Sequence, residues 1–223
     1  MTTPLRIAVL ASGRGSNLRA LLQARSRGEL RIDVVGVFSD QPGCPALLVA
    51  SEAGIATFAQ RPADFASRAE FDESMFSRIE AVQPDLIVCA GYMRLISDAA
   101  VSRFQGKIIN IHPSLLPKYP GLHTHARALA AGDREHGASV HCVIPELDAG
   151  AVIAQVRIPV LEGDGPESLS NRLLEREHAL LVQTVKAIAN GDLDISGNQP
   201  RWRGLPINTP LSSGPNGHLE DHG

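Results

Sequence analysis

Three polar side chains near the middle of the chain have the types and spacing for joint chemistry: Asn110, His112 and Asp148. The run Lys107–Ile111 is apolar and β-branched and stops just before a proline, so it predicts a buried strand with Asn110 and His112 at its carboxyl end. Residues two apart on a strand project from the same face. The amide of Asn110 and the imidazole of His112 are therefore expected to address one small volume.

Asp148 can add a carboxylate to this pair. It follows a second strand-like run, Ala138–Ile144, in a short loop with Gly150 beyond it. A carboxylate near a histidine raises the pKa of the imidazole, because it favours the charged form, and this brings the group toward a working pH near neutrality. No Ser or Cys nucleophile of the triad type is evident. The three residues predict a reaction in which the substrate brings the nucleophile and the protein stabilises a developing oxyanion.

A glycine-rich turn near the N-terminus predicts an anion site. The apolar run Arg6–Ala11 is followed by the turn Ser12–Asn17, after which the sequence has helical spacing. In such a turn the backbone N–H groups of Gly15, Ser16 and Asn17 can point at a phosphate, with Ser16 or Asn17 as the helix cap. The alternative is a glycine turn that only reverses the chain.

Two other nucleotide motifs fit this turn less well. It lacks the Gly-Lys-Ser/Thr of a Walker A loop, and Leu18 stands where a dinucleotide fingerprint has its third glycine. Asp40 does follow the next strand, Val34–Phe38, at about the spacing of the ribose-binding acid. A dinucleotide site therefore stays as a weaker alternative.

Strand-like and helical segments alternate along the chain, most clearly through Phe104. This rhythm predicts an α/β fold with a mainly parallel sheet, helices on both faces and a Rossmann-like N-terminal half. The predicted strands are Arg6–Ala11, Val34–Phe38, Ala56–Phe58, Leu86–Ala90, Lys107–Ile111, Ala138–Ile144 and Ala151–Val160. The first predicted helix begins near Leu18. The other predicted helices are Pro45–Ala53, Arg68–Val82, Asp98–Phe104, His125–Ala131 and Ser168–Ala189.

Length and composition bound the remaining choices. The 223 residues suffice for one sizeable core, and 43% hydrophobic residues are ordinary for a soluble globular protein. A net charge of -3 gives no footprint for nucleic acid. No apolar run approaches the roughly 18 residues of a membrane span, and the first residues lack a signal-peptide pattern. We expect a cytoplasmic protein with no membrane partner, one domain over 1–197, and a loose tail over 198–223 that is rich in Pro, Gly, Asn and Ser.

Cys44, Cys89 and Cys142 are an odd number of cysteines, and they predict free thiols rather than a disulfide framework. A zinc site is the alternative, because several histidines crowd the region around Cys142. The spacings match no structural zinc pattern, so we expect no metal.

Several of these motifs together resemble one known family. Asn110–Pro117, Lys118–His125 and Glu146–Gly150 closely resemble the folate-dependent phosphoribosylglycinamide formyltransferases of purine synthesis. The glycine turn and Ala90–Arg94 are similar to the same family, so the resemblance spans roughly residues 6–189. It implies the formyltransferase fold and transfer of a formyl group from 10-formyltetrahydrofolate to the amine of 5'-phosphoribosylglycinamide. It implies no metal, and a monomer or homodimer that works on small molecules.

The resemblance also implies roles for individual residues. Asn110 and His112 stabilise the oxyanion, and Asp148 raises the pKa of His112. The N-terminal half, to about residue 104, binds phosphate, and the C-terminal half carries catalysis and folate binding. The residues implied to bind the ribonucleotide are Gly15, Ser16, Asn17 and Glu177. Those implied to bind folate are Arg68, Met93, Arg94, Leu95, Ile96 and Asn110.

One position departs from the family pattern, and three other functions compete. Some relatives carry a polar residue that helps hold the ribonucleotide three positions before the Glu of Glu-His, where this chain has Leu174. The nearest rival is formyltetrahydrofolate deformylase, a hydrolase on the same core that usually carries an extra N-terminal domain, for which no room is left before Leu5. Methionyl-tRNA formyltransferase adds a C-terminal domain that the short tail does not match. A non-catalytic nucleotide-binding module is the third.

Overall fold

The computed structural model describes residues 3–197, 199–214 and 218–221. The chain divides into two compact units, Met1–Asn110 and Ile111–Gly223. One strand, β5 (Ile108–His112), carries the chain from the first unit into the second. Asn110 and His112 therefore lie on one strand, as the sequence predicts.

The first unit is built on parallel strands in the order β5-β4-β1-β2-β3. Every pairing between these neighbours is parallel. Because the strands run in one direction, the segments after β1 and β4 leave the same edge of the sheet, where ligands bind in folds of this kind. The strands other than β5 are β1 (Leu5–Leu10), β2 (Ile32–Ser39), β3 (Thr57–Ala59) and β4 (Leu86–Cys89).

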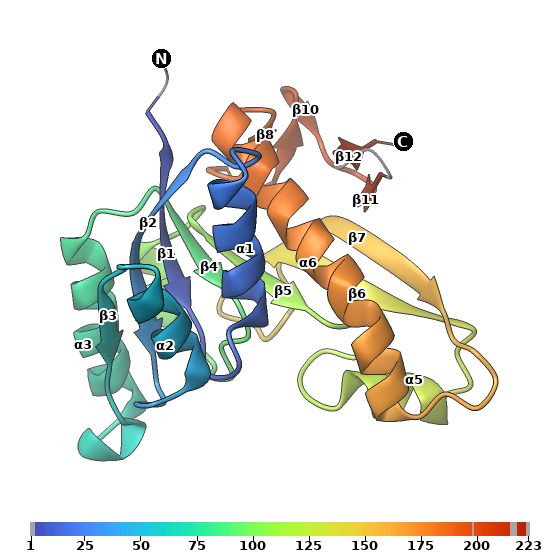
Figure 1. Ribbon diagram of the computed structural model, residues 1–223, viewed down its shortest axis with the longest axis horizontal. Coiled ribbons are helices and arrows are strands. Elements are labelled where there is room, and N and C mark those ends of the chain that lie inside the picture. Colours follow the sequence, from blue (N-terminus) through green and yellow to red (C-terminus); the bar gives the residue numbers. More distant parts are fainter. Residues whose placement is uncertain (1–2, 198, 215–217, 222–223) are drawn as a thin grey trace. The chain divides into compact units, whose positions relative to one another are not determined.

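Helices cover both faces of this unit (Figure 1). The chain moves one way from β1 to β3 and then returns to β4, so right-handed crossovers place α1 and α2 on one face and α3 and α4 on the other. In agreement, α1 packs against α2, and α3 against α4. This confirms the predicted Rossmann-like arrangement. The helical segments are α1 (Ser16–Ser26), α2 (Pro45–Glu52), the short 3-10 helix η1 (Pro62–Asp64), α3 (Arg68–Ala81) and α4 (Asp98–Arg103).

Local sequence explains why these elements form where they do. The central strands consist of apolar residues that are almost fully buried, such as Val9 and Ile87. A parallel strand covered on both faces needs this continuous apolar run. Helix α3 begins at Arg68 because the Ser67 side chain accepts a hydrogen bond from the N–H of Glu70, while the Glu70 carboxylate accepts one from Ala66.

The second unit has mixed strand directions. β6 and β7 are antiparallel, β7 and β11 are parallel, and β11 and β12 are antiparallel. Helix α6 packs against β6 and β7, and α5 packs against α6. Its strands are β6 (Glu135–Cys142), β7 (Val152–Pro159), β11 (Leu211–Ser213) and β12 (Leu219–Glu220), with a small separate sheet of β8 (Leu193–Asp194), β9 (Arg201–Trp202) and β10 (Leu205–Pro206). Its helices are α5 (Thr124–Ala130) and α6 (Pro166–Asn190).

The long helix α6 begins two residues before the predicted Ser168 and ends one residue after the predicted Ala189. Pro166 stands at its first position, where a missing N–H removes no helical bond, and Gly191 ends it with a left-handed φ of 79°. Its buried face includes Leu173 and Leu180. Within the described residues, no helix combines the length and the apolar character that a membrane crossing needs.

The C-terminal segment differs from the loose tail that its composition predicts. Asn198 lies outside the described residues, but 199–214 and 218–221 contain four short strands. β11 extends the sheet by pairing with the edge of β7, which offers unpaired backbone groups. Leu211 and Leu219 are 1% and 5% exposed and supply apolar anchors. Two buried leucines are too few to register in a composition dominated by Pro, Gly and Ser.

Candidate active site

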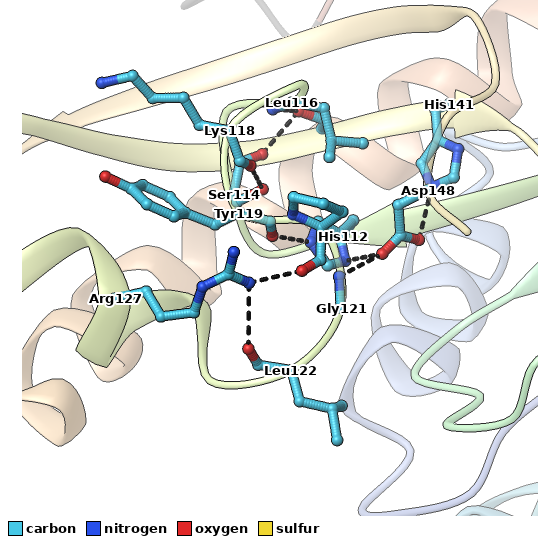
Figure 2. Close-up of polar contacts among 12 residues, drawn as sticks. His112, Ser114, Leu116, Lys118, Tyr119, Gly121, Leu122, Arg127, His141 and Asp148 are labelled. Carbon is cyan, nitrogen blue, oxygen red and sulfur yellow. Dashed lines mark hydrogen bonds and ion pairs between the residues drawn. The ribbon is translucent and has the colours of Figure 1, made fainter. Parts of the chain in front are cut away.

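His112 lies at the end of β5 with both ring nitrogens facing oxygen acceptors (Figure 2). Its Nε2–H donates to the carbonyl oxygen of Tyr119 at 2.9 Å, and its Nδ1 lies 3.5 Å from Oδ2 of Asp148. A carbonyl can only accept, so the Nε2 proton is required. A neutral ring would then turn a lone pair toward the carboxylate, whereas the imidazolium satisfies both acceptors.

Asp148 is held from three sides. Its Oδ2 accepts a hydrogen bond from the N–H of Gly121 at 2.8 Å, and its Oδ1 lies 3.5 Å from Nε2 of His141. Burial by itself raises the pKa of Asp148, but the hydrogen bonds from His141 and Gly121 and the nearby His112 outweigh it, so the pKa lies below the usual value. The carboxylate is therefore charged at neutral pH.

The pKa of His112 differs from the sequence-based expectation in its net direction. Burial lowers this pKa and is the largest effect, while the Tyr119 carbonyl and the Asp148 carboxylate raise it. Asp148 thus acts in the predicted sense, but the net pKa lies below that of an ordinary histidine. Sequence reasoning missed the size of the burial effect: the residue is only 7% exposed.

The loop that contains Tyr119 and Gly121 contacts both His112 and Asp148. Side-chain hydrogen bonds tie this loop to α5 and to the turn that follows α5. Tyr119 has a left-handed φ of 56°, and its hydroxyl donates to Asp133, which also accepts from Lys118. Arg127 on α5 donates to the carbonyl of Pro120 at 2.5 Å. The Lys118 ammonium pairs with the Asp133 carboxylate at 2.9 Å.

Two further residues on β6 support the site. Ser139 is fully buried, donates to the carbonyl of Ser114 and accepts from the N–H of Leu116, so it holds the loop that follows His112. His141 is the residue that sequence reasoning missed as a partner of Asp148. Alternation gave no reliable signal, because the pairing of β6 with β7 is irregular between Val140 and His141.

The glycine turn has the expected form but a different cap. Gly15 itself is the N-cap of α1, with a φ of 72° and no side-chain cap bond, so the prediction that Ser16 or Asn17 caps the helix is wrong. A Cβ at position 15 would lie 2.7 Å from the Cα of Ala46, which leaves room only for glycine. Ser16 and Asn17 are the first residues of the helix, where backbone N–H groups lack helical partners.

The segment between β4 and α4 presents two apolar side chains to solvent. Met93 and Leu95 are 68% and 42% exposed, while Ile96 is buried. The guanidinium of Arg94 lies 5.0 Å from the centre of the Phe71 ring. Exposed apolar groups beside a guanidinium suit a ligand with a flat ring and an acidic tail.

The remaining candidate residues lie on helices of their own units. Arg68 is exposed at the first position of α3. Glu177 and Leu174 are half-buried and three apart on α6, and therefore share one face of that helix. Asp40, the weaker dinucleotide candidate, accepts a hydrogen bond from the Ser12 hydroxyl at 2.6 Å. The cysteines are free, and within the described residues no three His, Cys, Asp or Glu side chains form a metal-binding group.

A second histidine pair, His125 and His136, lies outside these contacts. Nδ1 of His125 lies 2.9 Å from Nε2 of His136, so one ring donates and the other must keep a lone pair. Burial is the main cause that lowers the pKa of both, for His136 to about 4, with repulsion from His125 adding to it. In the unfolded chain His136 would take up its proton near pH 6.5.

The His136 shift predicts a pH-dependent stability. Between pH 6.5 and about 4, the unfolded state binds more protons at His136 than the folded state does. The contribution of neutral His136 to the free energy of unfolding is therefore complete above pH 6.5, and about 3 kcal/mol is lost as the pH falls through this range. Urea unfolding at pH 7 and pH 4.5 measures it. A His136→Gln variant should lose less stability on acidification than the wild type, whereas His218→Gln, at an exposed histidine, should match the wild type. Equal losses in all three proteins would contradict the assignment.

Comparisons of the sequence and of the structure with known proteins all find formyltransferases. The family model described as formyl transferase matches residues 5–185. Phosphoribosylglycinamide formyltransferase of Escherichia coli (strain K12) is 44% identical over 194 residues, which cover 87% of this chain and 92% of that protein. The solved structure of the Coxiella burnetii phosphoribosylglycinamide formyltransferase in complex with CHES is 43% identical, with a TM-score of 0.87 over 92% of this chain and 96% of that one.

A hydrolase with the same fold is less similar. The solved structure of formyltetrahydrofolate deformylase from Burkholderia mallei is 28% identical, with a TM-score of 0.79 over 90% of this chain and 70% of that one. The likeness in backbone is therefore shared between a transferase and a hydrolase, and the sequence identity is higher to the transferases.

Proposed function

The chain belongs to the formyl transferase family, and we propose that it transfers the formyl group of 10-formyltetrahydrofolate to the amine of 5'-phosphoribosylglycinamide in purine biosynthesis. The observation that carries this proposal is the pairing of His112 with a charged Asp148, whose side chain is 9% exposed. His112 stands two residues after Asn110 on one strand. In the reaction the amine nitrogen bonds to the formyl carbon, the carbonyl oxygen becomes an oxyanion, and the bond to the folate nitrogen then breaks.

Each of the three residues has a distinct role in the proposal. The Asn110 amide and the protonated His112 donate hydrogen bonds to the oxyanion. Asp148 favours the charged form of His112 and partly offsets burial, which is the largest effect and lowers the pKa of the ring. The proton that leaves the attacking amine reaches the folate nitrogen through a water relay, so protons balance without a net change on the protein. No step requires a metal.

The contacts of His112 add one requirement to this mechanism. Nδ1 faces Asp148 and Nε2–H donates to the Tyr119 carbonyl, so neither ring nitrogen is open to an oxyanion. We propose that the oxyanion replaces the Tyr119 carbonyl at Nε2, while Asp148 keeps its place at Nδ1. The loop that carries Tyr119 would then withdraw when the substrates bind.

We propose binding roles for the other candidate residues on the basis of the family resemblance and their local geometry. The N-terminal turn of α1 suits a phosphate, because its first N–H groups lack a side-chain cap. The exposed apolar pair Met93 and Leu95 suits the ring system of a folate. The ribonucleotide set is Gly15, Ser16, Asn17 and Glu177, and the folate set is Arg68, Met93, Arg94, Leu95, Ile96 and Asn110.

The proposal extends to the domain organisation, the partners and the cellular location of the protein. Residues 1–197 act as one formyltransferase domain, whose N-terminal half, to about residue 104, carries the phosphate site and most of the proposed folate residues, and whose C-terminal half carries His112 and Asp148. The partners are the two small-molecule substrates, with neither nucleic acid nor membrane. The protein works in the cytoplasm as a monomer or homodimer, with 10-formyltetrahydrofolate as co-substrate.

A single assay separates this function from its rivals. The purified full chain is mixed with 10-formyltetrahydrofolate, with and without 5'-phosphoribosylglycinamide, and both tetrahydrofolate and free formate are measured. A transferase should form tetrahydrofolate only when the acceptor is present, and should release little formate. Formate release without the acceptor would instead identify a deformylase, the function that the Burkholderia mallei structure favours as second candidate. No turnover in either mixture would indicate a binding module.

A further inference from the structure

The segment Met93–Ser97, which contains most of the proposed folate contacts, is hydrogen-bonded at both ends to side chains of other segments. We propose that Asp72 at one end and the Ser12–Asp40 pair at the other are positioning residues that fix the shape of this segment for folate. The inference rests on the proposed function. It goes beyond it by assigning a binding role to residues that make no proposed contact with either substrate.

The first anchor is the Ser12 hydroxyl. It accepts a hydrogen bond from the N–H of Met93 at 2.9 Å and donates one to Oδ1 of Asp40 at 2.6 Å. The N–H of Ser12 also donates to the carbonyl of Gly91 at 3.0 Å. A hydroxyl that donates to a carboxylate has a fixed orientation, so its lone pair is aimed at Met93. Asp40 is only 3% exposed, and its charge acts through Ser12.

The second anchor is the carboxylate of Asp72 on α3. Its Oδ2 accepts a hydrogen bond from the N–H of Ser97 at 2.6 Å, and the side chain is fully buried. Burial raises the pKa of Asp72, although the Ser97 bond and the charges of Arg68 and Arg94 oppose this. Both of those arginines belong to the proposed folate set. Asp72 therefore bonds the end of the segment and feels the charge of both cations.

The polar groups around Asp72 are costly to bury. In the part of the chain that the structure describes, Oδ1 of Asp72, the hydroxyl of Tyr92 and Nε of Arg94 are buried without a hydrogen-bond partner. Such atoms destabilise the fold relative to apolar side chains of the same size. The buried carboxylate of Asp72 therefore adds little to the stability of the fold. Its role is better explained by its hydrogen bond to Ser97, which fixes the conformation of the Met93–Ser97 segment.

The anchors account for the unusual exposure of the segment. A loop with two apolar side chains would gain free energy by turning them inward. The bonds at Met93 and Ser97 hold the backbone so that Met93 and Leu95 stay 68% and 42% exposed. A binding surface shaped in advance binds more tightly, because less conformational entropy is lost on association. Removal of either anchor should therefore weaken folate binding and leave the chemical step intact.

The test compares four variants of the full chain, with tetrahydrofolate as the probe in calorimetry under reducing conditions. Asp72→Ala and Ser12→Ala should each bind tetrahydrofolate about 10-fold more weakly, since each leaves a loop N–H without its acceptor. Asp72→Asn keeps an acceptor oxygen for the Ser97 N–H and should stay within about 3-fold of the wild type. Asp98→Ala is the matched control, an exposed aspartate on the helix that begins after Ser97, and should bind as the wild type does.

Steady-state kinetics provide the readout that a general loss of structure would not reproduce. At saturating 10-formyltetrahydrofolate, the kcat of Asp72→Ala should stay within about 2-fold of the wild type, and only its KM for the folate should rise, by about 10-fold. Its KM for the ribonucleotide should not change. Equal weakening of both substrates together with a lower kcat would overturn the proposal.

The remaining outcomes separate this inference from the proposed function. If the wild type binds tetrahydrofolate and transfers formyl groups, but Asp72→Ala and Ser12→Ala bind as tightly as the wild type, the anchors are refuted and the function stands. If the wild type neither binds tetrahydrofolate nor transfers formyl groups, the function itself fails, and the anchors with it. If Asp72→Ala does not fold, Ser12→Ala decides: unchanged folate binding refutes the proposal, and a selective loss supports it.

Discussion

A His112→Ala variant is expected to fold normally and to lose about 1,000-fold in kcat, because it removes a charged donor to the oxyanion. The ring lies at the end of β5 and its main contacts are polar, so its removal should leave the strand in place. The KM for both substrates should change little, since the lost interaction acts in the transition state. Stopped-flow or steady-state formyl transfer measures the effect.

The control for this prediction is an exposed histidine in the C-terminal segment. His218→Ala, at an exposed position, should keep the wild-type kcat. A second check is the thermal transition of His112→Ala, which should stay close to that of the wild type. A His112→Ala enzyme that turns over within 10-fold of the wild type would remove this residue from the mechanism.

Asp148→Asn should lower kcat by about 100-fold or more and shift the pH dependence. The carboxylate is one of the groups that raise the pKa of His112 against burial, so its loss should lower that pKa further. In the wild type, activity should fall in acid as the substrate amine takes up a proton, and in base as His112 loses one. The limb that belongs to His112 should move to lower pH in the variant.

Two measurements decide this prediction. Profiles of kcat and kcat/KM between pH 5.5 and 9.5 should be bell-shaped for the wild type, and a flat profile from about 6 to 9 would count against the role of His112. Asp164→Asn provides a matched control, because Asp164 is another hydrogen-bonded carboxylate of the same unit, paired with Arg172, and it should show wild-type activity. Near-normal turnover of Asp148→Asn would contradict its assigned role.

Much of the first unit could be predicted from the sequence. Each predicted strand from Arg6 to Ile111 is present within one or two residues, because continuous β-branched runs between turn residues have few other stable conformations. The strand boundaries of the second unit are harder to predict from the sequence. β6 begins at Glu135, three residues before the apolar run, and includes Gly137, where a Cβ would lie 2.0 Å from the carbonyl oxygen of Val156. Close approach of two strands, rather than local hydrophobicity, extends this strand.

The sequence of neighbouring residues determined which side chains could take part in the chemistry. The Asn-x-His spacing at the end of a strand places Asn110 and His112 on one face, and the glycine turn places backbone N–H groups at the start of α1. Both features depend only on a few neighbouring residues and on backbone geometry. Short-range backbone geometry therefore suffices to place an amide and an imidazole together on one face of a strand.

Tertiary structure alone decided the electrostatics of the site. It brought Asp148 to within 3.5 Å of His112 across 36 residues of chain, added His141 as a second neighbour, and set the Tyr119 carbonyl against Nε2. It also lowered the pKa of His112, because desolvation depends on everything that packs around the ring. A sequence states which groups can ionise, but only the packed fold determines how much water each one keeps.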